Sequence, residues 1–429
     1  MVREMKDSGI EWIGEIPEEW EVLRNKSVFS CKKQIVGMNS KSTQLLSLTT
    51  KGVKKRAIVD TYGKVPESYD TYQVVDADDI IMCLFDLDCS AVFAGISEMS
   101  GMISPAYKVL KCNYRVVPQF ANYWFGFIFV DRKFKFYAKN LRYTLTYDEF
   151  AVLPILIPDR NAQRKISSFL NEKCTKLDNV LEKTRASIEE YKKLKQAIIT
   201  QTVSKDVHDN RGMKDSGNKW IREIPSDIKI SRVGLHYQII LGKMLCTNQI
   251  DDTYTYEPYF CAADIHFEGI AESGRKKMWF SPLEKQQYLV RKDDLLVVEG
   301  GAGAGGCTVA PMQEVPTYIQ NSIMIVRPGK SADVRYLKYL LECLVKQGYI
   351  DVTCNKATIP HFTKDKLANV PFLVFSLQEQ KEIAQYLDKK CSDIDAIISY
   401  KENYIMEVEN YKKSLIYEYV TGKKEVPQK

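Results

Sequence analysis

The stretch LNEKCTKLDNVLEKTRASIEEYKKLKQAI (Leu170–Ile198) repeats its mainly apolar residues at alternating spacings of four and three. These positions are Leu170, Cys174, Leu177, Leu181, Thr184, Ile188, Tyr191, Lys195 and Ile198. The alternation is typical of the a/d seam of a coiled coil. No proline or glycine follows before Lys205. The pattern therefore predicts a helix of about 40–45 residues, roughly 60–68 Å long at 1.5 Å per residue.

A second segment, starting at Val370, aligns without a gap with the segment that starts at Leu153, at an offset of 217 residues. Its seam consists of Leu387, Cys391, Ile394, Ile398, Lys401, Ile405, Val408, Lys412 and Leu415. We expect the two seams to pair, chiefly through Leu170, Leu177, Leu181 and Ile188 with Leu387, Ile394, Ile398 and Ile405. The first helix leads to the second half of the chain and the second must return, so the pair is antiparallel. The alternative is two separate amphipathic helices, each packed on its own domain.

A short phrase is also repeated. MKDSGIEWIGEIPEEW (Met5–Trp20) matches MKDSGNKWIREIPSDI (Met213–Ile228) at ten of sixteen positions. The match indicates an internal duplication in which each copy of the phrase opens an equivalent half of the protein.

A globular head is predicted between phrase and helix in each half, at residues 21–153 and 229–370. Alternating apolar strings predict strands in TYQVVDADDIIMCLF, AYKVLKC, QQYLVRKDDLLVVEG and NSIMIVRP, and short helices in PQFANYWFGFIFV and VRYLKYLLECLV. The predicted fold is α+β, with two α/β heads separated by two long antiparallel coiled-coil helices and an internal pseudo-two-fold. The predicted domains are a first head at 1–153, a central helix at 154–205, a second head at 206–370 and a C-terminal helix at 371–429.

Composition narrows the class of protein. The chain has 429 residues, a net charge of +6 and a pI of about 8.5, which leans modestly towards an acidic partner. It has no apolar run of about eighteen residues and no apolar N-terminal signal, so we expect no membrane partner. Its eleven cysteines lack C-x-x-C spacing, which indicates free thiols in a reducing cytosol. His208, His236, His266 and His361 lie far apart, and no metal site is predicted.

Motifs for catalysis are weak. GGAGAGG (Gly300–Gly306) formally contains G-x-G-x-x-G, but no helical pattern follows it, so a close-approach loop is favoured over a dinucleotide site. GKS (Gly329–Ser331) lacks the upstream glycine of a phosphate loop. No N-P-P-Y or D-P-P-Y methyltransferase signature occurs. We therefore predict no catalytic residue and interpret the heads as binding modules.

Basic residues mixed with aromatic ones mark a candidate surface for nucleic acid. The clearest stretch is DRKFKFYAKNLRY (Asp131–Tyr143), in which cations would meet phosphates and rings would meet sugars or bases. The full candidate set is Lys54, Lys55, Arg56, Arg132, Lys133, Lys135, Lys139, Arg142, Tyr143, Arg275, Lys276, Lys277, Lys356, Thr358, His361 and Lys364. For each run alone, an ordinary solvated face is an equally good interpretation.

Besides the phrase MKDSGIEWIGEIPEEW, the chain contains the string ATIPHFTKDKLANVPFLVFSLQEQ and the terminal SLIYEYVTGK. These three motifs together resemble the specificity subunits of type I restriction–modification systems. One departure is Ala162, where the family usually has a glutamate before the glutamine. The resemblance implies a non-catalytic, cytoplasmic, double-stranded-DNA-reading subunit whose heads are target recognition domains for the two halves of a split sequence, with the helices setting the gap.

The same resemblance implies the partners. Two modification subunits would bring S-adenosylmethionine and the adenine methylation chemistry, and restriction subunits would bring ATP-driven translocation and cleavage with Mg²⁺, so this chain itself needs no cofactor. Two rival functions stay open. One is a protein-binding scaffold with two heads, which would not bind duplex DNA. The other is an enzyme with an unrecognised site in a head, which would act as the purified chain alone.

Overall fold

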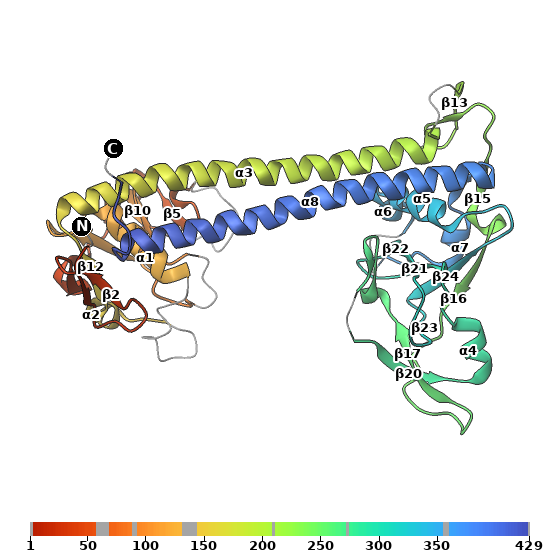
Figure 1. Cartoon of the computed structure of the whole chain (residues 1–429), viewed down its shortest axis with the longest axis horizontal. Helices are drawn as coiled ribbons and strands as arrows, with labels where there is room; N and C mark the ends of the chain where they lie inside the picture. The colour runs from red at the N-terminus through yellow and green to blue at the C-terminus, as the bar shows by residue number, and fades with distance from the viewer. Residues whose placement is uncertain are drawn as a thin grey trace. The chain divides into compact units, whose positions relative to one another are not determined.

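The computed structural model describes residues 3–56, 68–87, 92–130, 144–207, 211–271, 274–354 and 360–427. It divides into two compact units: unit 1 comprises Met1–Arg185 with Glu402–Lys429, and unit 2 comprises Ala186–Lys401. Each unit therefore contains one head and one stretch of each long helix (Figure 1). Within the described ranges, no helix combines the length and apolar character needed to cross a membrane.

The two predicted long helices are present as α3 (Arg160–Lys205, 46 residues) and α8 (Leu377–Val420, 44 residues). The sequence predicts helical segments from residues 154 and 371, whereas the structure places strands β12 (Pro154–Ile157) and β25 (Pro371–Leu373) there and begins each helix six residues later. The apolar residues in these strands pair with β3 (Glu21–Arg24) and β15 (Ile230–Arg232) instead of continuing the helical pattern.

Side-chain caps fix the helix starts. Asp159 Oδ1 accepts hydrogen bonds from the amides of Asn161 (2.8 Å) and Ala162 (3.1 Å) before α3. Ser376 and Glu379 exchange hydrogen bonds at the start of α8, as in a capping box. These contacts satisfy amides that the first helical turn leaves unbonded.

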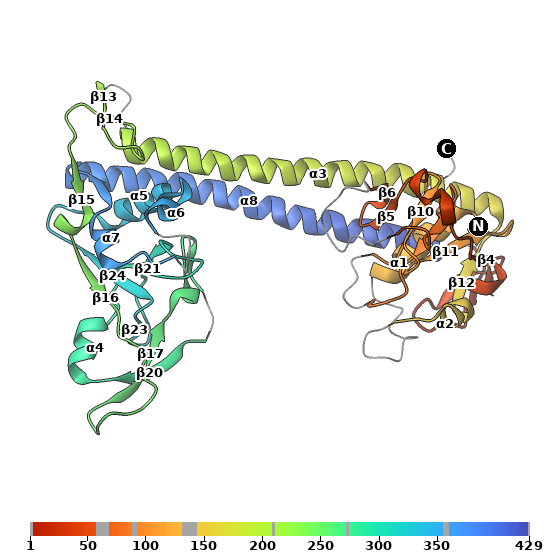
Figure 2. The same cartoon turned by 180° about the vertical axis from the view of Figure 1, so that it is seen from behind.

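In each unit α3 and α8 run antiparallel, as predicted (Figures 1 and 2). In unit 1 Asp178 pairs with Lys412, and in unit 2 Lys195 pairs with Asp395. As residue numbers rise along α3, those of its partners on α8 fall, which defines an antiparallel register. All eighteen predicted seam positions are buried or partly buried.

The head of unit 1 is built on a four-stranded antiparallel sheet of order β4-β11-β8-β9. These strands are β4 (Phe29–Lys32), β11 (Lys108–Cys112), β8 (Ile80–Met82) and β9 (Ala94–Ile96). Helix α1 (Pro118–Val130) packs on the sheet with Trp124 and Phe125 buried in the core. Smaller elements are β5 (Leu46–Thr49), β6 (Gly52–Lys55), β7 (Gln73–Val75), β10 (Gly101–Ile103) and α2 (Tyr147–Val152).

The head of unit 2 repeats this order as β16-β24-β21-β22, also antiparallel. These strands are β16 (Tyr237–Leu241), β24 (Ile323–Pro328), β21 (Leu295–Val298) and β22 (Cys307–Val309), and α5 (Val334–Lys346) packs on them. The repeated order agrees with the duplication inferred from the sequence. Further elements are β18 (Ile265–His266), β19 (Gly269–Ile270), α6 (Tyr349–Thr353) and α7 (Lys364–Ala368).

Unit 2 also has a second sheet of order β20-β17-β23, formed by β20 (Lys276–Phe280), β17 (Thr255–Phe260) and β23 (Tyr318–Ile319). One predicted strand is partly wrong. Residues 286–288 of QQYLVRKDDLLVVEG belong to helix α4 (Pro282–Tyr288), and only β21 is a strand. Ser281 and Glu284 form a capping box and Pro282 sits in the first turn, so a helix begins there.

The repeated phrase folds into the same hairpin twice, β1 (Met5–Asp7) with β2 (Glu15–Pro17) and β13 (Met213–Asp215) with β14 (Glu223–Pro225), in the same register. In each copy the aspartate accepts a hydrogen bond from the glycine amide two residues later, at 3.0 Å for Asp7 and 2.9 Å for Asp215. Gly9 and Gly217 both have φ of 68°, a left-handed conformation that favours glycine. The shared aspartate and glycine are therefore residues that the turn requires.

Candidate nucleic-acid interface

In unit 1 the predicted basic loop lies on strand β6 of the β5–β6 hairpin. Lys54 and Lys55 are exposed and pair across the hairpin with Ser47 and Leu46. Neither lysine has an ion-pair partner within the described ranges. Arg56 follows the strand, half-buried, and its amide donates to the carbonyl of Leu45 at 2.9 Å. The hairpin thus presents two ammonium groups to solvent.

Several predicted residues lie outside the described residues, so their placement stays a prediction. They are Arg132, Lys133, Lys135, Lys139, Arg142 and Tyr143 in unit 1, and Lys356 and Thr358 in unit 2.

In unit 2 the predicted run Arg275–Lys277 forms the start of edge strand β20. Arg275 is half-buried: it donates to the carbonyl of Ala271 at 2.9 Å, and its guanidinium lies 4.6 Å from the ring centroid of Phe260. Lys276 and Lys277 are exposed. Arg275 therefore anchors the segment, and the two lysines supply positive charge at its surface.

His361 and Lys364 lie on a different part of the head, beside the β21–β22 connection. His361 is exposed and forms a β-bridge with Gly300, and its carbonyl accepts a hydrogen bond from Lys366 Nζ at 2.7 Å. A Cβ at Gly300 would come within 3.1 Å of His361 Nδ1, so this glycine allows two backbone segments to approach. Exposed Lys364 begins α7, which Thr363 caps. The glycine-rich stretch leads into strand β22 and not into a helix, as its interpretation as a loop requires.

The structure adds two residues that the sequence analysis missed. Tyr256 on β17 and Trp279 on β20 are directly opposite each other, with ring centroids 5.3 Å apart. They share one face of the sheet with Lys277 because side chains two residues apart on a strand point the same way. The alternation of exposed or partly buried residues with a buried one in Lys277–Met278–Trp279 indicates that Lys277 and Trp279 share a face. The position of Tyr256 on that face follows only from the pairing of β20 with β17.

Two cysteines have raised thiol pKa values. Burial raises the pKa of Cys112 to about 12 and that of Cys391 to about 11, so these thiols stay protonated near neutral pH and are poor nucleophiles. Across the described ranges, no three His, Cys, Asp or Glu side chains are grouped to hold a metal ion.

Comparison with known proteins agrees with this description. The family model for the type I restriction modification DNA specificity domain matches residues 225–408. The MjaX type I restriction enzyme specificity subunit of Methanocaldococcus jannaschii is 23% identical over 96% of this chain and 95% of its own length. The MjaVIII specificity subunit of the same organism is 24% identical over 45% of this chain and 42% of its own length.

Solved structures show the same fold. One chain, from work on complex assembly and conformational transition of a type I restriction–modification system, superposes with a TM-score of 0.69 and 17% identity, covering 95% of this chain and 99% of that one. The HsdS subunit of Thermoanaerobacter tengcongensis gives a TM-score of 0.53 and 17% identity, covering 95% of this chain and 98% of that one.

Both units contain a head of the same sheet order and a stretch of the antiparallel helices α3 and α8, which defines a duplicated architecture. Residues 225–408 of this chain match the type I restriction–modification DNA specificity domain, and the chain resembles specificity subunits along almost its whole length, as the sequence motifs predict. This similarity supports a role in DNA-target specificity.

Proposed function

We propose that each head reads one half of a split DNA target and that the α3–α8 helix pair sets the gap between the halves. The observation that carries the proposal is that the two heads share one sheet architecture but differ in the elements added to it. Both heads keep the sheet order and a buried aspartate, Asp79 or Asp294, before the equivalent strand. Unit 2 has the three-stranded β20-β17-β23 sheet, whereas in the described part of unit 1 the β5–β6 hairpin is joined to β10 only by a single parallel bridge between Leu45 and Met102. Equivalent scaffolds with different surfaces suit two different half-sites.

The buried aspartates explain how both heads keep the same sheet architecture. Asp79 accepts hydrogen bonds from the Asp76 amide at 2.8 Å and from Lys32 at 3.3 Å. Asp294 accepts an equivalent bond from the Arg291 amide at 2.8 Å, and bonds from Arg327 at 2.8 and 2.9 Å. A cation holds the carboxylate in both heads, from β4 in unit 1 and from β24, the strand next to β21, in unit 2. Recognition residues can therefore vary elsewhere without changing the sheet.

The test of this function is a map of methylated adenines in host DNA with and without the gene. A split motif that depends on the gene supports the proposal. Exchanging residues 21–153 for those of another family member should change one half of the motif and leave the other half intact. If the purified chain shows no salt-dependent binding of duplex DNA, the result favours the protein-scaffold alternative.

We further propose that the chain has no catalysis of its own and that two modification subunits dock on it. S-adenosylmethionine would bind to those subunits, and ATP and Mg²⁺ to restriction subunits that join the complex. The purified chain, given S-adenosylmethionine, should therefore transfer no methyl group to DNA. Methyl transfer by the pure chain would favour the enzyme alternative.

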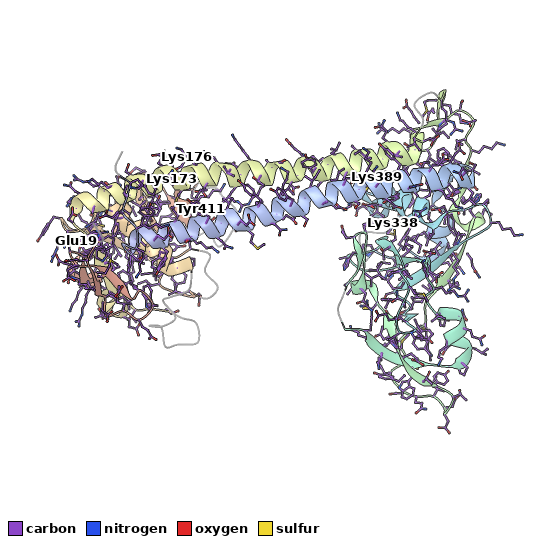
Figure 3. All side chains as sticks on the ribbon, viewed as in Figure 1. Glu19, Lys173, Lys176, Lys338, Lys389 and Tyr411 are labelled. Carbon is purple, nitrogen blue, oxygen red and sulfur yellow. The ribbon has the colours of Figure 1, made fainter. Side chains whose placement is uncertain are left out.

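An exposed apolar pair on the helices of each unit supports two equivalent docking positions. In unit 1, Val180 on α3 is 37% exposed and Tyr411 on α8 is 57% exposed. Figure 3 labels Tyr411 on α8. At the positions related by the duplication, Ile397 is 37% exposed and Leu194 is 47% exposed in unit 2. The ion-pair register places the two members of each pair at the same level. Apolar side chains kept exposed in both copies are typical of a protein interface.

The stoichiometry of the purified complex tests this docking. Changing Val180 and Tyr411 to Asp should remove one modification subunit and leave the other, because unit 2 keeps its own pair. Native mass spectrometry measures the copies bound. Tyr114→Asp in unit 1 is the matched control, because Tyr114 is exposed but lies outside the helix pair. Two bound copies in the double variant would contradict the assignment of these residues.

A further inference from the structure

The antiparallel strands β17 and β20 of unit 2 form a two-stranded ribbon with two different faces. One face is buried: Tyr259, Met278 and Phe280 pack with Tyr318 of β23. The other face carries Tyr256 opposite Trp279, and Lys277 opposite Pro258. We refer to this second face, defined by Tyr256, Lys277 and Trp279, as the recognition face.

The recognition face exposes aromatic surface that the core does not need. Tyr256 is 51% exposed, and its ring contacts the partly buried ring of Trp279 at an interplanar angle of 49°. The outer edge of β20 is held by a hydrogen bond from the Trp279 amide to the carbonyl of Cys246 at 3.1 Å. The neighbouring Met244 and Leu245 are also exposed. Contiguous exposed apolar surface that is rigidly held is typical of a binding site.

Positive charge lies beside the aromatic pair. Lys277 is two residues from Trp279 on the same face, about 7 Å away along the strand. The side-chain ammonium groups of Lys276 and Lys277 have no hydrogen-bond or ion-pair partner among the residues that the structure describes. Ammonium groups next to an apolar face are complementary to DNA, because the ammonium groups can contact phosphates while the apolar face contacts the neighbouring bases. Lysines also protect edge strands from pairing, and the experiment below separates the two roles.

The position of the ribbon in unit 2 fits contact with a large ligand. Figures 1 and 2 show β17 and β20 at the end of unit 2 that lies away from α3 and α8. Both strands fall within residues 225–408, which match the DNA specificity domain.

We propose that this ribbon enters the major groove at the half-site read by unit 2, with Tyr256 and Trp279 against the methyl group of a thymine and Lys277 at a phosphate. The major groove, about 12 Å wide, admits a two-stranded ribbon, and the thymine methyl is an apolar group there. The proposal rests on the DNA-reading function given above. It adds the base type, the groove and the residues that read it.

The test uses the full chain and duplexes that carry its methylated motif, with binding followed by fluorescence anisotropy. Each thymine of the motif is replaced in turn by uracil, which lacks only the methyl group. At one position in one half-site, this replacement should weaken wild-type binding about fourfold, the effect of one buried methyl-sized group. Changing Tyr256 and Trp279 together to Ala should weaken binding about tenfold or more and abolish the difference between thymine and uracil.

Matched controls separate recognition from folding. Leu283→Ala changes an exposed apolar residue on the neighbouring α4 and should retain both affinity and thymine preference. Lys277→Ala should lower the slope of log affinity against log salt by about one, whereas Lys330→Ala should not. An unchanged melting temperature of the double variant shows that the head remains folded. If the melting temperature of the double variant is lowered, DNA binding is measured instead with Lys277→Ala, alone and combined with Tyr256→Phe.

The outcomes are distinct. Thymine preference that persists in the folded double variant, or no uracil effect in the wild type, overturns the ribbon assignment and leaves DNA reading intact. An unchanged salt slope in Lys277→Ala assigns that lysine to edge protection. If the wild type does not distinguish its methylated motif from a scrambled duplex, the proposed function itself fails.

Discussion

Gln163 and Gln380 occupy equivalent positions in the first turn of the two long helices and make the same three hydrogen bonds. Each side-chain oxygen accepts from the amide just before a head helix, Val117 at 2.7 Å or Asp333 at 2.9 Å. The Gln163 nitrogen donates to the carbonyls of Arg115 (2.9 Å) and Pro158 (2.8 Å). The Gln380 nitrogen donates to those of Ser331 (3.1 Å) and Phe375 (2.8 Å). Both glutamines are fully buried, so each ties its head to a long helix.

The first prediction follows from this burial. Gln163→Ala should destabilise unit 1, and Gln380→Ala unit 2, by about 2–4 kcal/mol, because several buried polar groups lose their partners. Hydrogen exchange should rise in α1 for the first variant and in α5 for the second. Gln378→Ala, which changes an exposed glutamine on the same turn as Gln380, is the control. If hydrogen exchange rose equally in both units for either variant, the effect of the glutamine would not be confined to its own unit.

A second prediction concerns Arg211, which joins three carboxylates in unit 2. It contacts Asp206 at 2.9 Å, Asp227 at 2.6 Å and Glu379 at 2.7 Å, and the Asp206 side chain is fully buried. Arg211→Met leaves that carboxylate without its cation and should cost about 2–3 kcal/mol, or about 4–12 °C in melting temperature for a unit of this size. Lys214→Met, at an exposed position on the same hairpin, should change melting far less.

The stability that this cluster contributes depends on pH in a defined direction. Burial alone would raise the pKa of Glu379, but hydrogen bonds from Ser376 and Arg211 outweigh it and lower the pKa below its ordinary value. A lowered pKa in the folded state contributes stability above the unfolded pKa, near 4.5, and loses it as pH falls through the folded pKa. Glu379→Gln should therefore flatten the loss of unit 2 stability below about pH 5. A steeper loss in that variant would contradict the assignment.

The sequence predicted the elements that depend on period and repetition. The 4-3 seam predicted both long helices, the connectivity of the chain predicted their direction, and the repeated phrase predicted two equivalent halves. It also showed that Ala162 departs from the family pattern. The structure supplies the consequence, because Glu379 at the equivalent position binds Arg211, whereas Arg3 of unit 1 pairs with Glu19 and Glu425 instead.

Contacts between segments far apart in sequence could not be predicted. The alignment matches Gln163 with Gln380, but nothing local shows that a helix-start glutamine reaches an amide 46 or 47 residues away. Tyr256 and Trp279 face each other only because β17 and β20 pair across an intervening hairpin. Helix α4 was missed because its apolar alternation continues into β21, while the cap at Ser281 decides the local structure.

A third prediction addresses the stretch Asp131–Tyr143. Each Lys or Arg at a phosphate adds about one unit to the slope of log affinity against log salt. Changing Arg132, Lys133 and Lys135 to Ala should therefore lower the slope by about three units, measured by titration of duplex DNA at several salt concentrations. Lys330→Ala is the single-charge control. A slope equal to that of the wild type would assign the stretch to an ordinary solvated face.

The last prediction separates the roles of helices and heads. Tyr191 and Lys401 contact each other, with the ammonium 5.5 Å from the ring centroid, so they mark one level of the helix pair. Repeating residues 184–190 before Tyr191 and residues 402–408 after Lys401 inserts one heptad in each helix at that level and keeps both seams in register.

The insertion lengthens the helix pair by about 10 Å, close to three base pairs at roughly 3.4 Å each. Both heads are unchanged, so the bases within each half-site should stay the same while the gap between them grows. The growth can be less than three base pairs, because bending DNA by tens of degrees costs only a few kcal/mol and absorbs part of the change. Sequencing of methylated sites in cells that carry the variant measures both quantities. An altered half-site with an unchanged gap would mean that the helices, and not the heads, select the bases.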